Sequence, residues 1–309
     1  MCYNAFPRVN PTAGKNVKRI ESARNPLIKT AFRLQRSQFK DSDGFLVEGE
    51  KLIREALRSG AALKCLFITE GYESAWNDNG DRNGNRNRNR NRNGNGLEEY
   101  VAVLPEKVMK KLSQLENPPS AIGLFSPPPP FDLNQALENS RTVVVLDRVQ
   151  DPGNLGTIIR SCEGLGAECL ILLKGSCSPL NPKVIRAAAG SSFRVPIVPN
   201  LDGPEALSQL RRHGFRCIAT AGDGKDLRNS TFPERCAFFL GTEGTGLSNF
   251  LRDECDERIA IPMVGVTESF NVSIATAICL YERLRRKPAM MTTTVAAPMT
   301  VQSTAQVTT

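Results

Sequence analysis

The part of the chain after residue 140 alternates regularly between short apolar segments and segments with helical periodicity. Short apolar strands that alternate with helices are typical of a parallel sheet whose two faces are both covered. The pattern therefore predicts an α/β domain over residues 141–288, with a parallel sheet at its centre. The predicted strands are residues 142–149, 168–174, 193–198, 215–221, 236–241 and 257–263, and the predicted helices begin near residues 154, 182, 203, 247 and 271.

The first part of the chain predicts a second, smaller α/β domain over residues 17–126. Its clearest element is a basic amphipathic helix at residues 25–37, because Leu27, Ile28, Ala31 and Leu34 share one face. The other predicted strands and helices are residues 45–50, 50–60, 63–69, 100–105, 106–115 and 121–126.

Four segments do not have the pattern of a packed domain. Residues 77–96 contain little besides Asn, Arg and Gly, which predicts an insertion in a surface loop. Residues 127–140 begin with four prolines, so we predict an extended linker there. Residues 1–16 and the uncharged residues 289–309 are predicted to be disordered tails.

The charge and the cysteines narrow the class of protein. The formal net charge is +8, which favours nucleic acid as a partner, although a basic surface kept for solubility explains the charge equally well. The nine cysteines lack the paired C-x-x-C spacing of zinc or redox sites, and no metal site is expected. Their odd number, without a signal peptide, predicts a cytoplasmic protein. No apolar run approaches the ~18 residues of a membrane-spanning helix.

Three segments of the second domain each join the end of a predicted strand to the start of a helix. They are residues 151–167, 238–248 and 261–277. Ligands of open α/β sheets bind beyond the carboxyl ends of the strands, so one site could collect polar groups from all three segments. These groups are Asn154, Arg160, Glu243, Ser269 and Asn271.

Each of these residues also has an ordinary structural explanation. Asn154, Ser269 and Asn271 could simply cap helices, Arg160 could be a solvated helix residue, and Glu243 could favour a helix start. The glycines of the middle segment do not form a dinucleotide fingerprint or a P-loop, because their spacing is G-x-x-G-x-G and no Lys follows. Only the combination of the three segments indicates a ligand site, and no single residue does so.

The three segments closely resemble the motifs of one enzyme family. D-P-G-N-x-G-x-x-x-R, L-G-x-E-G-x-G-L-S and I-P-M-x-G-x-x-x-S-x-N-V-S-x-A are similar to the motifs of the SpoU (TrmH-like) RNA 2'-O-ribose methyltransferases, of the SPOUT class. The match covers about residues 141–287, and residues 17–126 look like that family's RNA-binding domain. The resemblance implies S-adenosylmethionine as cofactor, a deep trefoil knot in the parallel-sheet domain, a homodimer, and RNA as substrate.

The resemblance also implies roles for particular residues. The catalytic set is Asn154, Arg160, Glu243, Ser269 and Asn271. The cofactor-binding set is Gly241, Thr242, Gly246, Ile261, Pro262, Met263 and Phe270. Two of these depart from the family pattern, because Thr242 stands where Asn is frequent and Phe270 where Leu is usual. Among the basic residues, the candidates for RNA phosphate contacts are Lys29, Arg36, Lys183 and Arg186.

The implied reaction is an in-line displacement in which a ribose 2'-hydroxyl attacks an activated methyl group. In similar enzymes Arg160 is given the role of base, but a guanidinium group normally stays protonated, so stabilisation of the developing alkoxide is the other interpretation. The expected substrate is 23S ribosomal RNA. Transfer RNA, or a non-catalytic role in RNA binding or ribosome assembly, are the alternatives. A nucleotide-dependent dehydrogenase lacks its glycine fingerprint here.

Overall fold

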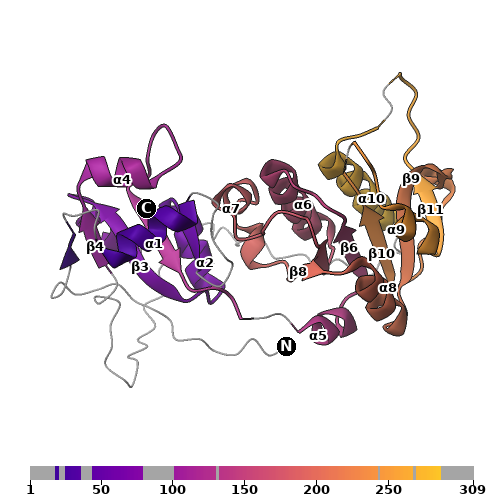
Figure 1. Cartoon of the computed structure of the whole chain (residues 1–309), viewed down its shortest axis with the longest axis horizontal. Helices are drawn as coiled ribbons and strands as arrows, with labels where there is room; N and C mark the ends of the chain where they lie inside the picture. The colour runs from indigo at the N-terminus through magenta and orange to yellow at the C-terminus, as the bar shows by residue number, and fades with distance from the viewer. Residues whose placement is uncertain are drawn as a thin grey trace, which may run out of the picture.

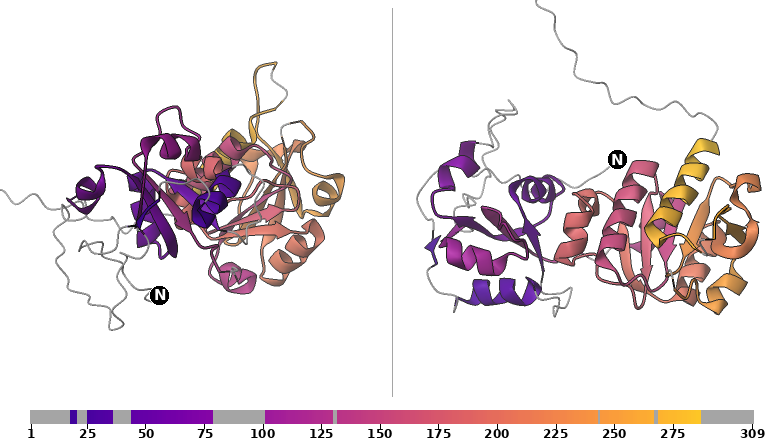
Figure 2. Two further views of the ribbon diagram at one scale, coloured as in Figure 1. Left: turned by 60° about the vertical axis from the view of Figure 1, so that its left-hand side comes forward. Right: turned by 90° about the horizontal axis from the view of Figure 1, so that it is seen from above.

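The computed structural model describes residues 18–20, 25–35, 44–78, 101–129, 132–242, 244–266 and 269–286. These residues form two β-sheets that lie side by side, and helix α7 (Pro182–Ala187) lies between them (Figure 1). The view from above in Figure 2 shows the same arrangement. The predicted tails at 1–16 and 289–309 and most of the insertion at 77–96 lie outside the described residues.

The C-terminal sheet is parallel throughout, as the alternating pattern predicts. Its strand order is β11-β9-β10-β6-β7-β8, and every pair of neighbours runs in the same direction. Its strands are β6 (Thr142–Leu146), β7 (Cys169–Leu173), β8 (Ile197–Leu201), β9 (Arg216–Asp226), β10 (Cys236–Leu240) and β11 (Glu257–Ala260). Its helices, besides α7, are α5 (Leu133–Glu138), α6 (Pro152–Leu165), α8 (Gly203–Arg212), α9 (Asn249–Glu254) and α10 (Val272–Arg286).

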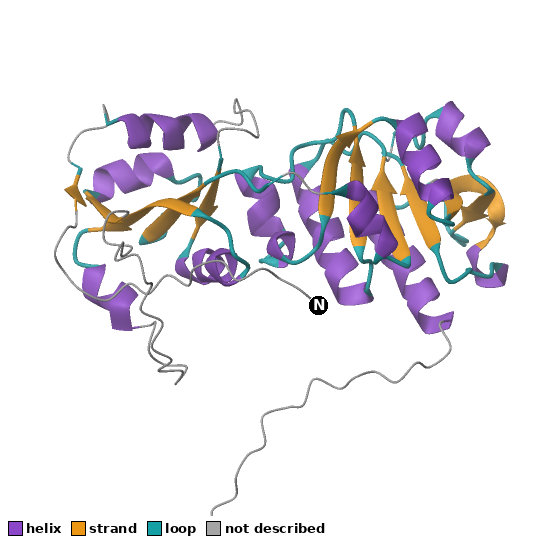
Figure 3. Cartoon of the chain, turned by 90° about the horizontal axis from the view of Figure 1, so that it is seen from below, coloured by secondary structure: helices purple, strands orange, loops and turns teal. Residues whose placement is uncertain are grey.

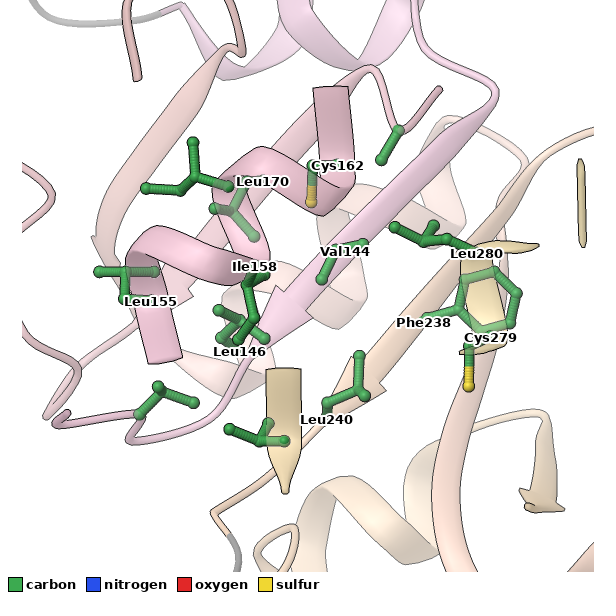
Figure 4. Packing of buried hydrophobic residues seen from close by; sticks show 14 of the residues in the cluster. Val144, Leu146, Leu155, Ile158, Cys162, Leu170, Phe238, Leu240, Cys279 and Leu280 are labelled. Carbon is green, nitrogen blue, oxygen red and sulfur yellow. The ribbon is translucent and has the colours of Figure 1, made fainter. Parts of the chain in front are cut away.

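Helices cover both faces of this sheet, so its central strands β6, β7 and β10 are buried at every position. Along β6, Val144 and Leu146 belong to the core under α6, α7 and α10, whereas Val143 and Val145 belong to the core under α5, α8 and α9. Figure 4 shows Ile158 of α6 beside Val144 and Leu146 in the first of these cores. Burying a side chain of this size contributes about 1.5–3 kcal/mol, which holds α6 firmly against the sheet.

The N-terminal sheet is smaller and mixed (Figure 3). Its order is β1-β4-β3-β5-β2, in which β5 is antiparallel to both of its neighbours. Its strands are β1 (Lys18–Arg19), β2 (Phe45–Glu48), β3 (Leu63–Thr69), β4 (Val101–Leu104) and β5 (Ala121–Phe125). Its helices are α1 (Pro26–Gln35), α2 (Glu50–Arg58), α3 (Glu73–Asp78) and α4 (Glu106–Leu112).

Two local predictions differ from the structure. The predicted strand at 193–198 begins only at Ile197, because the preceding residues Ser191–Phe193 form a 3₁₀ turn that packs toward the N-terminal sheet. The predicted linker at 127–140 contains helix α5, which Asp132 caps. The buried residues Ala136 and Leu137 attach that helix to the core of the C-terminal sheet. The trefoil knot stays a prediction, since strand order alone does not specify how the chain is threaded.

Within the described residues, no helix combines the length and the apolar character needed to span a membrane.

Candidate functional site

The site is built where the strand order of the C-terminal sheet reverses. The chain passes from β6 to β7 on one side and later returns to β10 on the other, so that Leu146 and Leu240 lie in register at the carboxyl ends of β6 and β10. Loops that leave such a switch point diverge and open a crevice for a ligand. The loops after these two strands, residues 147–151 and 241–248, are therefore where such a crevice is expected.

Helix α6 presents the first predicted side chain. The helix begins at Pro152, and its N-cap is Asp151, whose carboxylate accepts a hydrogen bond of 2.7 Å from the backbone amide of Asn154. The prediction that Asn154 caps the helix is therefore wrong. Proline favours the first helical position, and this places the cap one residue before it. The side chain of Asn154 instead has a partner outside α6.

That partner is Asn271. Its side-chain amide donates a hydrogen bond of 3.0 Å to the side-chain oxygen of Asn154. The side-chain oxygen of Asn271 accepts bonds of 2.9 and 2.6 Å from the backbone amide and the hydroxyl group of Ser273. Asn271 thus caps α10 as predicted, and at the same time ties the start of α10 to the start of α6.

The loop after β10 folds back on itself at two glycines. The amide of Gly246 donates to the carbonyl oxygen of Thr242 at 2.9 Å, and the hydroxyl groups of Thr242 and Thr245 are 2.8 Å apart. A Cβ atom on Gly241 would lie 2.1 Å from the carbonyl group of Gly246, so only glycine fits there. Glu243 lies outside the described residues, and its predicted role stays a prediction.

The loop after β11 carries the remaining predicted cofactor residues. Ile261 is half-buried, whereas Pro262, Met263 and Phe270 are exposed. Ser269, the last residue of the predicted catalytic set, is exposed beside Phe270. The structure therefore brings the loop residues to the same edge of the sheet, with apolar side chains and main-chain groups open to a ligand.

Arg160 lies apart from this cluster within one chain. It is six residues after Asn154 on α6, which is about 9 Å along the helix axis, and its side chain is exposed. It forms no hydrogen bond or ion pair with another described residue. A shallow hollow of about 400 Å³ between α6 and α10 begins beside it, since Thr157 and Ser161 line that hollow.

The predicted RNA contacts fall in three different settings. Lys29 on α1 and Lys183 on α7 are exposed. Arg186 is half-buried and donates a hydrogen bond of 2.8 Å to the carboxylate of Glu48 in the N-terminal sheet, so it does not lie free on the surface. Arg36 lies outside the described residues.

Sequence reasoning missed two residues that hold the site together. Asp147 directly follows β6 and is buried, and its carboxylate accepts bonds from the backbone amide of Ser248 at 2.9 Å and from the guanidinium of Arg148 at 3.0 and 3.2 Å. Arg148 has a positive φ of 58° and reaches the carbonyl oxygen of Gly246 at 3.5 Å. The pair thus links the end of β6 to the loop after β10. The sequence feature that could have indicated this role is the pair of charged residues directly after an apolar strand.

The described residues contain no group of three or more His, Cys, Asp or Glu side chains that could hold a metal ion.

Comparisons with known proteins show what the chain is similar to. Residues 141–281 match the SpoU rRNA Methylase family, and residues 25–123 match an MRM3-like substrate binding domain. The chain is 30% identical over 267 residues to the 23S rRNA (guanosine(2553)-2'-O)-methyltransferase RlmP of Bacillus subtilis, which covers 86% of this chain and 98% of that protein.

Two solved structures are similar over most of the chain. An AdoMet-bound rRNA methyltransferase from Sinorhizobium meliloti has a TM-score of 0.74 and 30% identity, covering 88% of this chain and 99% of that one. The SpoU methyltransferase AviRb from Streptomyces viridochromogenes, solved with AdoMet, has a TM-score of 0.70 and 26% identity, covering 85% of this chain and 98% of that one.

Proposed function

Because the chain belongs to the SpoU rRNA methylase family, we propose that it is an S-adenosylmethionine-dependent methyltransferase that modifies a ribose 2'-hydroxyl of 23S ribosomal RNA. The observation that carries this proposal is the hydrogen bond between Asn154 and Asn271. It joins the first and third motifs at the switch point of the sheet, where a ligand is expected. The relative RlmP, which is named for its action on 23S ribosomal RNA, is matched over 98% of its own length and over 86% of this chain.

The loops after β10 and β11 fit the cofactor. Main-chain groups of Gly241, Thr242 and Gly246 would hold its polar edges. The backbone is most accessible at Gly246, which is exposed and has no other atom within 4 Å of the position of a Cβ atom. Ile261, Pro262, Met263 and Phe270 offer apolar surface for its flat ring. Thr242 and Phe270, the two departures from the family pattern, supply a hydroxyl group and a larger apolar surface without closing the crevice. When bound, S-adenosylmethionine supplies a methyl group that is already activated on a sulfonium.

The protein residues then have to align the ribose and control one proton. We propose that Ser269 and Asn271 hold the ribose, and that Asn154 fixes the orientation of the Asn271 amide. The guanidinium of Arg160 stabilises the alkoxide that develops as the 2'-hydroxyl loses its proton. Glu243 completes the set by orienting Arg160 or the ribose.

We also propose that the active form is a homodimer. The hollow between α6 and α10 is lined mostly by apolar atoms, and Ile274 and Tyr281 of α10 are 50% and 57% exposed beside it. A second copy packed on this face would cover them, and it would also approach Arg160 on α6. Sedimentation should give a dimer, and Tyr281→Glu should give an inactive monomer; a stable, active wild-type monomer would exclude this part of the proposal.

The N-terminal domain, residues 17–126, is proposed to bind the RNA. Its exposed basic residue Lys29 on α1 lies on the solvent side of an amphipathic helix whose other face is buried. Arg36 continues the same basic segment, and Lys183 adds an exposed positive charge on α7. Such residues contribute sequence-independent phosphate contacts, so each should add to the salt dependence of binding.

The experiment that tests the proposal is a map of 2'-O-methyl groups in total RNA from cells with and without the gene. We expect one position in 23S ribosomal RNA to lose its methyl group, and purified protein to restore it with S-adenosylmethionine. A change confined to transfer RNA would show that transfer RNA is the substrate in place of ribosomal RNA. An unchanged map would favour the non-catalytic alternative. Calorimetry should give heat with S-adenosylmethionine and none with NAD. With ribosomal RNA as substrate, we propose that the enzyme acts in the cytoplasm.

A further inference from the structure

A buried ion pair links the N-terminal sheet to helix α7. The guanidinium of Arg186 donates to one carboxylate oxygen of Glu48, at the end of β2, over 2.8 Å. The hydroxyl group of Ser113 donates to the other carboxylate oxygen at 2.5 Å. The side chain of Glu48 is only 3% exposed. A buried carboxylate without its charged partner is costly, so Glu48 holds Arg186 in place.

A second arginine bridges two helices from the two halves of the chain. Arg194 donates to Glu55 on α2 at 3.2 Å, and through a second nitrogen to Glu163 on α6 at 3.0 Å. The hydrogen bonds from Arg194 lower the pKa of Glu163. A single planar guanidinium that engages two carboxylates fixes their geometry more closely than an ammonium group would.

Apolar contacts between these ion pairs close the same interface. Ile185 of α7 is 1% exposed, within a cluster whose other fully buried members belong to the N-terminal sheet and its helices. The rings of Phe193 and Phe45 are 6.3 Å apart. Gly190 has a φ of 95°, and a Cβ atom there would lie 1.6 Å from a carboxylate oxygen of Glu55, so the backbone at Gly190 lies close to the side chain of Glu55.

The other side of the same segment packs tightly on α6. A Cβ atom on Gly156 of α6 would lie 2.4 Å from the Cβ atom of Ala187. Helix α6 carries Asn154 and Arg160 of the candidate site. Residues 181–194, which we call the wedge, therefore contact the N-terminal sheet on one side and the helix of the site on the other (Figures 1 and 2).

We propose that the wedge fixes the distance from the RNA-binding domain to Arg160 and thereby selects the nucleotide that is methylated, an inference that rests on the proposed function. Arg186 and Arg194 act in it as positioning residues, and Arg186 is not a phosphate contact. A rigid spacing allows one ribose of a bound RNA to reach the site. If the two domains moved independently, several neighbouring riboses would reach it.

The test compares Glu48→Gln, Arg186→Gln and the double variant, using the full-length protein and transcribed 23S ribosomal RNA. A displacement of about 1 Å can cost roughly 10²-fold in rate, so each single variant should lose kcat/KM for RNA by up to that factor. The products should include methyl groups on neighbouring nucleotides, while the KM for S-adenosylmethionine stays within about twofold. The double variant should have a kcat/KM no lower than that of either single variant, because both substitutions remove the same interaction.

The matched control is Arg211→Gln. Arg211 also pairs with acidic residues, Asp256 at 3.2 Å among them, but it does so within the C-terminal domain. It should retain both the rate and the single product. A phosphate contact predicts the opposite pattern, in which Arg186→Gln weakens RNA binding and Glu48→Gln does not; that pattern would overturn the proposal. Glu55→Gln, at the less buried pair, provides a second variant if Glu48→Gln fails to fold.

Small-angle X-ray scattering without RNA provides a readout that is independent of activity. We expect a larger maximum dimension for Glu48→Gln and Arg186→Gln than for the wild type and Arg211→Gln. Variants that keep the wild-type scattering profile and a single product nucleotide would overturn the proposal about the wedge, but they would leave the proposed function intact. A wild-type protein that methylates no RNA would instead overturn the proposed function, and the selection of a nucleotide with it.

Discussion

The side-chain amide of Asn271 donates a hydrogen bond of 3.0 Å to the side-chain oxygen of Asn154, which lies 117 residues earlier in the chain. The bond joins the N-terminal ends of α6 and α10, the helices of the first and third motifs. It orients both amides at the edge of the crevice before any ligand binds. Preorganised polar groups of this kind are effective in catalysis because they need no rearrangement during the reaction.

Replacing Asn271 with Ser separates its two roles. Serine caps a helix about as well as Asn, so the free energy of unfolding should fall by less than about 0.5 kcal/mol. Its side chain is too short to reach Asn154, so methyl transfer should fall by roughly 10²-fold. Thermal denaturation and single-turnover assays measure the two effects. An active Asn271→Ser variant would show that the bond to Asn154 has no catalytic role.

Gly241→Ala should damage cofactor binding. The new Cβ atom would lie 2.1 Å from the carbonyl group of Gly246 and would push the loop after β10 open. The control is Gly244→Ala in the same loop, where the Cβ atom would have no neighbour within 4 Å. Calorimetry should give at least a tenfold weaker Kd for S-adenosylmethionine with Gly241→Ala, equivalent to about 1.4 kcal/mol, and little change with the control. Equal affinities in the two variants would contradict the loop geometry.

Two glycines of α6 should respond to alanine in opposite directions. Gly156→Ala would force its Cβ atom against Ala187, and overpacking of this kind typically costs about 1–3 kcal/mol of stability. Gly164→Ala meets nothing within 4 Å, and it should raise helix stability by up to about 1 kcal/mol. Denaturant unfolding measures both. A neutral Gly156→Ala would mean that α7 does not pack closely on α6.

Cys177 should react slowly with alkylating reagents at neutral pH. Burial, and secondly the charge of Asp151, raise the pKa of its thiol to about 11. A raised thiol pKa favours the neutral form, and only the thiolate reacts, so the rate should rise about tenfold per pH unit between pH 7 and 9.5. Iodoacetamide labelling of the Cys177 peptide, read by mass spectrometry, tests this. In protein unfolded by urea, the labelling rate should level off near pH 8.5, the usual pKa of a thiol. If the labelling rate of the folded protein levelled off at the same pH, burial would not raise the pKa of Cys177.

The sheet could be predicted from the sequence because its strands are buried on both faces. Val143, Val144, Val145 and Leu146 form an uninterrupted apolar run, which an exposed strand would not tolerate. The start of α6 could be predicted only approximately, because Asp151 and Asn154 are both good caps and Pro152 decides between them. Glycines and caps at the strand ends identified the loops of the site.

Contacts between distant residues could not be predicted in the same way. The sequence makes Arg186 a candidate phosphate contact because it is basic. It does not reveal the pairing with Glu48, which lies 138 residues away, because no local pattern joins the two residues. Asp147 and Arg148 end a predicted strand, but the positive φ of Arg148 and the bond from Ser248 depend on the loop after β10. The hydrogen bond between Asn154 and Asn271 likewise depends on how α10 returns to α6.

The most direct test of the account is the transfer of labelled methyl groups from S-adenosylmethionine to ribosomal RNA by the wild-type protein and by Arg160→Ala. Arg160 is exposed and makes no bond to another described residue, so the substitution should leave folding unchanged, and the protein should still bind RNA through its N-terminal domain. We predict that transfer falls by at least roughly 10²-fold, the usual effect of removing one group that stabilises a developing oxyanion. Equal transfer by the two proteins would contradict the assignment of this crevice as a methyltransferase site.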